Sequence, residues 1–214
     1  MVDIPDVMAT LASERALYHS EADFQHAFAW ELHRRLPEAK IRLEYRIETE
    51  TGVMHLDLLV VRHDEHLAIE LKYKTRNLVL VSAGEKYKLT SHSAQDCGRY
   101  DFIKDIVRLE RVVESVPVSS GCAILLTNDP TYWAPTVQRN TVDAAFRLGE
   151  GRELVGELRW GDAASPGTTH GRQEPLQLRL HYQLAWREYS NCMDMPGSRF
   201  RYLVVGVPGS LRSG

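Results

Sequence analysis

Residues 53–74 read VMHLDLLVVRHDEHLAIELKYK. Two runs rich in Val, Leu, Ile and Tyr, Val53 to Arg62 and His66 to Lys74, enclose a short polar stretch. This pattern is typical of two strands joined as a β-hairpin. Because successive side chains of a strand point to opposite faces of the sheet, the hairpin decides which side chains lie together.

Three isolated charges lie within these apolar strands: Asp57, Glu70 and Lys72. Removing such charges from water costs several kcal/mol each unless they are paired or bind a ligand. If the connection is tight and Arg62 pairs with Leu67, Asp57 lies opposite Lys72 and Leu59 lies opposite Glu70. The three charged side chains then share one face, and opposed residues have Cβ atoms about 5 Å apart. Two carboxylates could hold one cation beside a lysine.

A purely structural arrangement stays open at this point. Asp57 and Lys72 could form a cross-strand ion pair, with Glu70 facing solvent at an edge of the sheet.

An Asp followed on the next strand by Glu-x-Lys, after an acidic amphipathic helix, resembles the PD-(D/E)XK nuclease superfamily. The resemblance covers about residues 20–129, and Leu56 stands where the named motif has a proline, which supplies no ligand atom. It implies an α/β fold of the restriction-endonuclease-like type. That fold has an α-β-β-β-α-β core with a mixed central sheet flanked by helices, here with an inserted hairpin and extra C-terminal strands.

The same resemblance implies a metal-dependent catalytic site. Asp57 and Glu70 would bind Mg²⁺ together with the backbone carbonyl of Leu71, and Mn²⁺ could substitute. Lys72 would orient the attacking water or stabilise charge on the phosphorus. Mg²⁺ suits this reaction because it prefers oxygen ligands and screens an anionic phosphodiester.

The helix before the hairpin is predicted to begin after Ser20, an N-cap residue, and to run to about Leu36. Its apolar stripe is Phe24, Phe28 and Leu32. Glu21 matches the catalytic acid that the resemblance places near the metal, and Asp23 or Glu31 can be aligned with that position instead. Ordinary stabilisation of the first turn by an anion would also explain Glu21.

The remaining elements are predicted from their patterns. Before Asp129, they are a strand at Ile41–Thr49, an inserted hairpin within Arg76–Thr90, a helix from Ser93 to about Glu114, and a buried, parallel strand at Cys122–Thr127. Further strands are predicted at Leu154–Trp160, Leu176–Trp186 and Phe200–Val207, the last two extending or covering the sheet, with a loop at Ala163–Pro175. At 214 residues and 43% hydrophobic content, we expect a single domain over 1–214, with the core at about 20–129 and a C-terminal elaboration at 130–214.

Cations gather at the end of the third strand and beyond it, where the single anion Glu85 stands against Lys72, Lys74, Arg76, Lys86 and Lys88. Four are candidates for phosphate contact: Lys74, Arg76, Lys86 and Lys88. A nucleic-acid contact would make binding fall with salt. The alternative is a solvated hairpin whose charges protect an edge strand.

Gln95 and Tyr100, in the following helix, resemble the Gln/Tyr motif of exonuclease-type relatives and are further nucleic-acid-binding candidates. One more residue separates them than is usual there. Capping by Ser93 and an ordinary helix surface are the alternative. Lys104 of the same helix could also reach the site.

Composition sets the expected location and limits other chemistries. Three cysteines without CxxC spacing cannot all pair, which fits a reducing compartment. The start of the chain has no basic targeting segment, and no apolar run is long enough to span a membrane, so we expect a cytoplasmic protein. The net charge of −3 does not by itself indicate nucleic-acid binding. Motifs of P-loop, serine hydrolase and zinc protease sites are missing from the sequence.

Two functions follow. The first is a Mg²⁺-dependent deoxyribonuclease in restriction, repair or defence against foreign DNA, with RNA open as a substrate and a homodimer as one way to cut both strands. The second is a catalytically inactive nucleic-acid-binding or protein-interaction module on the same fold. The presence of Asp57, Glu70 and Lys72 together favours the enzyme.

Overall fold

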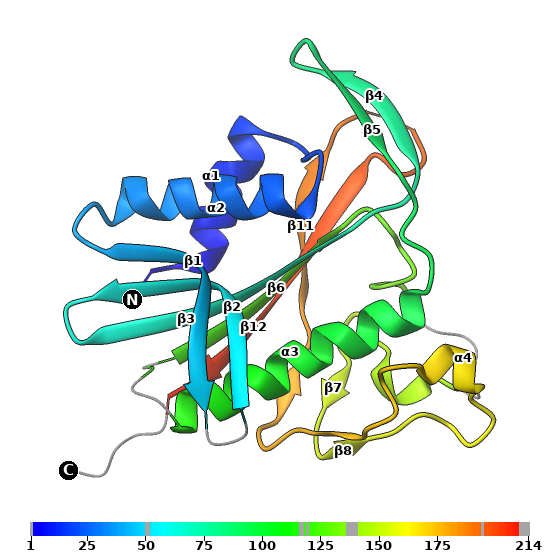
Figure 1. Cartoon of the computed structure of the whole chain (residues 1–214). Helices are drawn as coiled ribbons and strands as arrows, with labels where there is room; N and C mark the ends of the chain where they lie inside the picture. The colour runs from blue at the N-terminus through cyan, green and yellow to red at the C-terminus, as the bar shows by residue number, and fades with distance from the viewer. Residues whose placement is uncertain are drawn as a thin grey trace.

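The computed structural model describes residues 2–49, 52–115, 118, 120–135, 141–193 and 195–209. A six-stranded mixed sheet forms its centre (Figure 1). In spatial order its strands are β1 (Lys40–Thr49), β2 (Gly52–Arg62), β3 (Glu65–Lys74), β6 (Ser120–Thr127), β12 (Arg199–Pro208) and β11 (Trp186–Asn191). β3 and β6 run parallel, whereas the other neighbours are antiparallel. The predicted α/β class with a mixed central sheet is confirmed.

Helices cover both faces of this sheet (Figure 1). α1 (Ile4–Glu14) and α2 (Glu21–Arg35) lie on one face, and α3 (Gln95–Ser115) crosses the other. The predicted stripe of α2 is fully buried, and the Ser20 hydroxyl caps this helix by accepting from the Asp23 N–H at 3.1 Å. α1 was not predicted, although Asp3 caps it and a proline stands in its first turn, both of which favour a helix start.

The β2–β3 pairing differs from the prediction. His63, with φ of 51°, and Asp64 form a two-residue turn, so Arg62 pairs with Glu65. The predicted pairing of Arg62 with Leu67 is therefore wrong by two residues. A shift by an even number leaves every paired side chain on its predicted face, so the error does not separate the charged residues.

The same shift changes which residues lie opposite one another. Leu59 lies opposite Ala68 rather than Glu70. The last pair of the ladder is Leu58 with Ile69, and Asp57 and Glu70 follow it on the two strands. Asp57 therefore lies beside Glu70, and its predicted position opposite Lys72 is wrong.

The β1–β2 hairpin bends at Glu44 and Asp57. Glu44 has φ of 48° between the pairs Leu43–Leu58 and Tyr45–Leu56. Beyond the bend the hairpin turns toward α3 (Figure 1), and Leu56 packs into the core on that side, whereas Leu58 packs on the opposite face. Asp57 therefore stands where β2, β3 and α3 approach one another.

The predicted hairpin between β3 and α3 is confirmed as β4 (Leu78–Ser82) and β5 (Glu85–Leu89), which extend away from the sheet (Figure 1). β6 is buried along its whole length and pairs parallel to β3, as predicted for an apolar run after a helix. β12 extends the sheet at the predicted position.

Two long strands predicted in the C-terminal region are wrong. Their residues form the short pairs β7 (Glu153–Leu154) with β10 (Tyr182–Gln183) and β8 (Glu157–Leu158) with β9 (Leu176–Gln177). Gly156, with φ of 70°, separates β7 from β8. Two short helices complete this region: the 3₁₀ helix η1 (Ala144–Phe146) and, within the predicted loop, the single turn α4 (Pro166–Thr169).

Candidate active site

Asp57 and Glu70 lie side by side where β2 leaves β3. Asp57 Oδ2 accepts a hydrogen bond from the Leu71 N–H at 2.6 Å. Burial raises the pKa of Asp57, although the Leu71 N–H, the Lys72 charge and a side-chain hydrogen bond with Glu70 act against the rise. The predicted proximity of the two carboxylates is present.

Glu70 is the most deeply buried acid of this group, at 2% exposure. Burial, followed by the nearby Asp105 carboxylate, raises its pKa to about 9. Arg108 Nη2 lies 3.2 Å from Glu70 Oε1, but this oxygen has no hydrogen bond within the described residues. The interpretation with Glu70 facing solvent at a sheet edge is therefore wrong, since β3 is an interior strand between β2 and β6.

Lys72 shares the face of Glu70 and is held from two directions. Its Nζ lies 3.0 Å from Asp105 Oδ2 and donates to the Leu71 carbonyl at 3.3 Å. Burial opposes its charged form, but the carboxylates of Asp105, Asp57 and Glu21 outweigh that cost and raise the pKa of Lys72 above its ordinary value. Lys72 is thus a fixed cation.

Glu21 reaches the group from the first turn of α2. Its Oε2 accepts from the Tyr73 N–H at 2.7 Å, directly after Lys72 in β3. The other two acids that could be aligned with it are engaged elsewhere: Asp23 with Arg15 at 2.7 Å and Glu31 with Arg35 at 2.5 Å. Among these three acids of α2, Glu21 is the one that the structure brings to the site.

Two members of the group were missed in the sequence. Asp105 is 4% exposed on α3, and Arg108 bridges it at 3.0 Å while also donating to the His55 carbonyl at 2.6 Å. A charged i, i+3 pair inside the apolar stripe of α3 was the available signal. Lys104 is exposed, so α3 turns its neighbour Asp105 toward the site instead.

Four acids therefore face two bases here: Glu21, Asp57, Glu70 and Asp105 against Lys72 and Arg108. We call these six residues the acidic cluster. Within the described ranges, no set of three or more His, Cys, Asp or Glu side chains is already arranged around one point as a metal cage. The donor chemistry nevertheless fits a hard divalent cation, because carboxylate oxygens and the Leu71 carbonyl are the ligands it prefers and Glu70 Oε1 lacks a hydrogen bond.

Of the four cations predicted to contact phosphate, two lie in a cleft beside the acidic cluster and two are exposed farther from it. Lys74 and Lys88 line a cleft of about 220 Å³ that also contains Glu21. Lys86 is exposed on the outer face of the β4–β5 hairpin, and Arg76 is exposed after β3. The hairpin is anchored through Glu85, which lies 2.8 Å from His19 Nε2.

The two candidates on α3 are not brought together at the surface. Gln95 is half-buried, and its amide donates to Asp129 at 3.1 Å. Tyr100 is 2% exposed, stacks on Trp160 and donates to the Glu174 carbonyl at 2.8 Å. The structure gives Tyr100 a place in the core, where it has no access to a nucleic acid.

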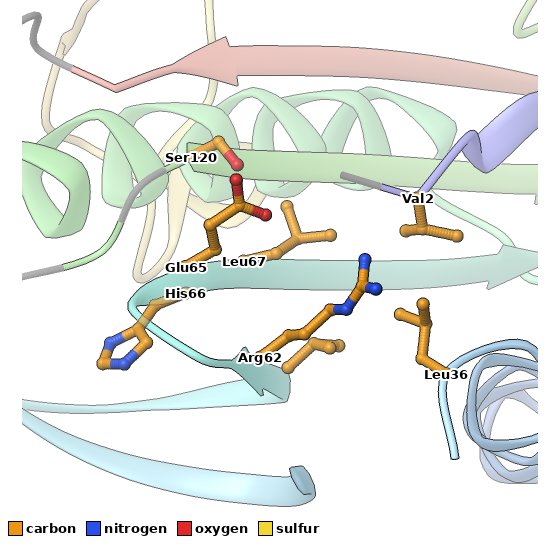
Figure 2. A pocket seen from close by; sticks show the side chains of 8 residues that line it. Val2, Leu36, Arg62, Glu65, His66, Leu67 and Ser120 are labelled. Carbon is orange, nitrogen blue, oxygen red and sulfur yellow. The ribbon is translucent and has the colours of Figure 1, made fainter. Parts of the chain in front are cut away.

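A separate small cavity of about 30 Å³ lies at the opposite end of β3, near the β2–β3 turn. Figure 2 shows Arg62 reaching there toward Val2 and Leu36. Arg62 also pairs with Glu38 at 2.7 Å. This cavity has room for little more than a water molecule, so it is not a competing substrate site.

Comparisons with protein-family models, curated proteins and solved structures find no match for this chain. The described helices include none with the length and apolar character needed to cross a membrane. Cys97, Cys122 and Cys192 are free thiols.

Proposed function

We propose that this protein is a Mg²⁺-dependent deoxyribonuclease with the fold and site of the PD-(D/E)XK superfamily. The observation that supports it is the convergence of Asp57, Glu70 and Lys72 at the bend of the β1–β2 hairpin, under α3. Buried carboxylates in excess of their counterions are costly unless a function uses them. Phosphodiester hydrolysis with a divalent cation is such a function.

Asp57, Glu70 and the Leu71 carbonyl would hold the cation. When bound, a divalent cation supplies Lewis-acid polarisation of the phosphate and lowers the pKa of a water. Glu70 must release its proton for this, because its pKa is raised to about 9 without a cation. Cation binding is therefore coupled to proton release at neutral pH.

Lys72 contributes a positive charge to the site and does not act as a proton acceptor. The carboxylates around it keep its pKa raised, so it stays an ammonium ion near neutral pH. A fixed ammonium group stabilises negative charge that develops on the phosphate oxygens. Of the two roles that family resemblance implies for Lys72, the geometry favours charge stabilisation.

Asp105 and Arg108 act as positioning residues. Asp105 holds Lys72 at 3.0 Å, and Arg108 holds Asp105 and the carbonyl of His55 in the outer half of the hairpin. Together they fix β2 and β3 relative to α3. Glu21 fixes the end of β3 through the Tyr73 N–H.

The test is incubation of plasmid, linear duplex and single-stranded DNA with the protein and Mg²⁺ or Mn²⁺, with EDTA as the control. We expect cleavage that EDTA abolishes and that Glu70→Gln reduces by a factor on the order of 10³. Glu48→Gln, which changes an exposed acid of β1, is the matched control and should leave the rate unchanged. Undiminished cleavage by Glu70→Gln would contradict the proposal.

One observation favours the second candidate, a non-catalytic nucleic-acid-binding module. Lys72 and Arg108 already partly neutralise the carboxylates, and no preformed metal cage exists in the described part of the chain. Salt-dependent retardation of DNA without any cutting would support that candidate.

A further inference from the structure

A second polar cavity, of about 380 Å³, lies at the start of α3. In Figure 1 this end of the helix lies where the chain arrives from β5, next to α4. The polar lining of the cavity includes Lys74, His92, Ser93, Tyr132 and the charged pair Asp101 and Arg172. We call it the Tyr132 cavity.

Tyr132 is a buried tyrosine whose hydroxyl is left without a partner. The residue is 2% exposed, and the Arg99 guanidinium lies over its ring at 5.4 Å. Among the residues that the structure describes, none forms a hydrogen bond with this hydroxyl. This hydroxyl is not among the fully buried polar atoms that lack a partner, so it opens into the cavity, where it can donate to a ligand.

Gly98 makes the space that the Tyr132 hydroxyl occupies. A Cβ at position 98 would overlap the hydroxyl oxygen of Tyr132, so one of the two would have to move. The glycine lies in the first turn of α3, so the hydroxyl is directed at the N-terminal end of a 21-residue helix. The helix dipole makes such an end favourable for an anion, and the first-turn N–H groups of Cys97 and Gly98 already donate to Asp96 and to the Ala94 carbonyl.

The other polar groups of the Tyr132 cavity are mainly donors. His92 Nδ1 accepts from the Thr75 N–H at 2.9 Å, which leaves the ring proton on Nε2. Burial and the Lys74 charge lower the pKa of His92, so the ring is neutral and donates. Lys74 adds an ammonium group.

Arg172 and Asp101 neutralise each other in the cavity wall through two hydrogen bonds of 2.7 Å. The surplus charge facing the cavity is therefore the positive charge of Lys74. Donor groups with one net positive charge match a ligand that carries several acceptor oxygens and negative charge.

We propose that the Tyr132 cavity binds a phosphomonoester group. A tetrahedral phosphate accepts hydrogen bonds in several directions, which suits donors from β3, from the loop before α3 and from Tyr132. Lys74 and His92 also line the cleft that contains Glu21, so the bound phosphate lies next to the acidic cluster. The phosphate could belong to a free nucleotide or to the end of a nucleic-acid strand, and the second source rests on the proposed nuclease function.

Binding is measured by calorimetry in EDTA, with the Glu70→Gln protein so that no strand is cut. The probes are inorganic phosphate, a nucleoside monophosphate, the corresponding nucleoside, and oligonucleotides with or without a terminal phosphate. We expect saturable binding of the monophosphate and none of the nucleoside. Tyr132→Phe and Lys74→Gln should each weaken binding about tenfold or more, because each removes a donor to a charged group.

Two matched control variants and one stability measurement distinguish loss of binding from loss of folding. Tyr45→Phe and Lys40→Gln make the same chemical changes at exposed positions of β1 and should leave binding unchanged. Tyr132→Phe should unfold at the same or a higher temperature without ligand, since it removes an unpaired hydroxyl. Equal binding by Tyr132→Phe, or equal binding of nucleoside and monophosphate, would overturn the proposal.

The oligonucleotide arm separates the two sources of phosphate. Tighter binding of the phosphorylated strand than of the hydroxyl-terminated strand supports a strand-end site, and binding of the free monophosphate alone supports a nucleotide site. If no probe binds while EDTA-sensitive cleavage by the native protein persists, the cavity proposal fails and the nuclease proposal stands. The reverse result supports the cavity proposal and contradicts the nuclease proposal.

Discussion

The acidic cluster and the Tyr132 cavity are neighbours with opposite chemistry. Around Glu70, acceptor oxygens outnumber donors, and carboxyl pKa values are raised by burial. Around Tyr132, donors outnumber acceptors and the surplus charge is positive. The two regions meet near Lys74, which lies two residues after Lys72 in β3. One strand thus connects a region suited to a cation with a region suited to an anion.

Lys72→Met should change the cleavage rate more than Asp105→Asn or Arg108→Gln. It tests whether the positive charge within the acidic cluster takes part in catalysis. The variant removes the fixed ammonium group from the acidic cluster, and we expect the cleavage rate with Mg²⁺ to fall by a factor on the order of 10³. Steady-state and single-turnover rates on linear DNA are the measurement. Lys40→Met, at an exposed position of β1, is the control. A Lys72→Met protein that cuts at the native rate would remove Lys72 from the mechanism.

Asp105→Asn separates positioning from direct action. The Asp105 carboxylate holds Lys72 without being one of the proposed metal ligands, so the loss of rate should be smaller, on the order of 10²-fold. The acidic limb of the pH profile should also move to lower pH, because the Asp105 carboxylate helps to raise the pKa of Glu70 and its removal lets Glu70 lose its proton more readily. Cleavage rates measured across the pH range are the test. An unchanged profile would show that Asp105 has only a structural role.

The stability of the metal-free protein should fall as pH rises, which tests the electrostatics of the acidic cluster alone. The folded pKa of Glu70 is about 9, above its ordinary value of 4.5, so the folded state binds more protons than the unfolded state between these values. The stabilisation is complete below the ordinary pKa and is lost as pH rises through about 9. The raised pKa values of Asp57 and Asp105 act in the same direction.

Thermal unfolding from about pH 5 to about pH 9 in EDTA is the measurement, and we expect the midpoint to fall by about 5 °C or more. Glu70→Gln should flatten this dependence, and Mg²⁺ should reduce it in the native protein. Glu48→Gln should retain the full slope. A flat profile for the native protein would show that Glu70 titrates normally.

Much of the fold was predictable because local patterns and burial agree. The stripe of α2, the β2 and β3 runs and the apolar β6 each indicate both the type of element and its buried face. The failures lie where tertiary contacts override local pattern. Residues 154–160 and 176–186 look like long strands, but Gly156 and packing on α3 break them into two-residue pairs.

The sequence predicted the part of the site that lies on the strands but not the part that lies on α3. Asp57, Glu70 and Lys72 are visible because charge inside an apolar strand is unusual. Asp105 and Arg108 are not visible in that way, since charges are common along a helix and only the placement of α3 on the sheet buries these two. The pairing of β2 with β3 depends on the turn at His63, whose left-handed backbone no pattern in the sequence specifies.

Arg108→Gln should have the smallest effect of these variants. It tests whether the acidic cluster is suited to a cation, through its affinity for Mg²⁺. Arg108 lies 3.2 Å from Glu70 and 3.0 Å from Asp105, so it supplies part of the positive charge that a divalent cation would otherwise provide. Without it, the cluster should bind Mg²⁺ more tightly, by about tenfold, because one competing positive charge is gone. Calorimetric titration of Mg²⁺ at fixed pH is the measurement. Arg111→Gln, which changes an exposed arginine one turn farther along α3, should leave the affinity unchanged. Weaker Mg²⁺ binding by Arg108→Gln would mean that Arg108 holds the carboxylates in place rather than competing for them.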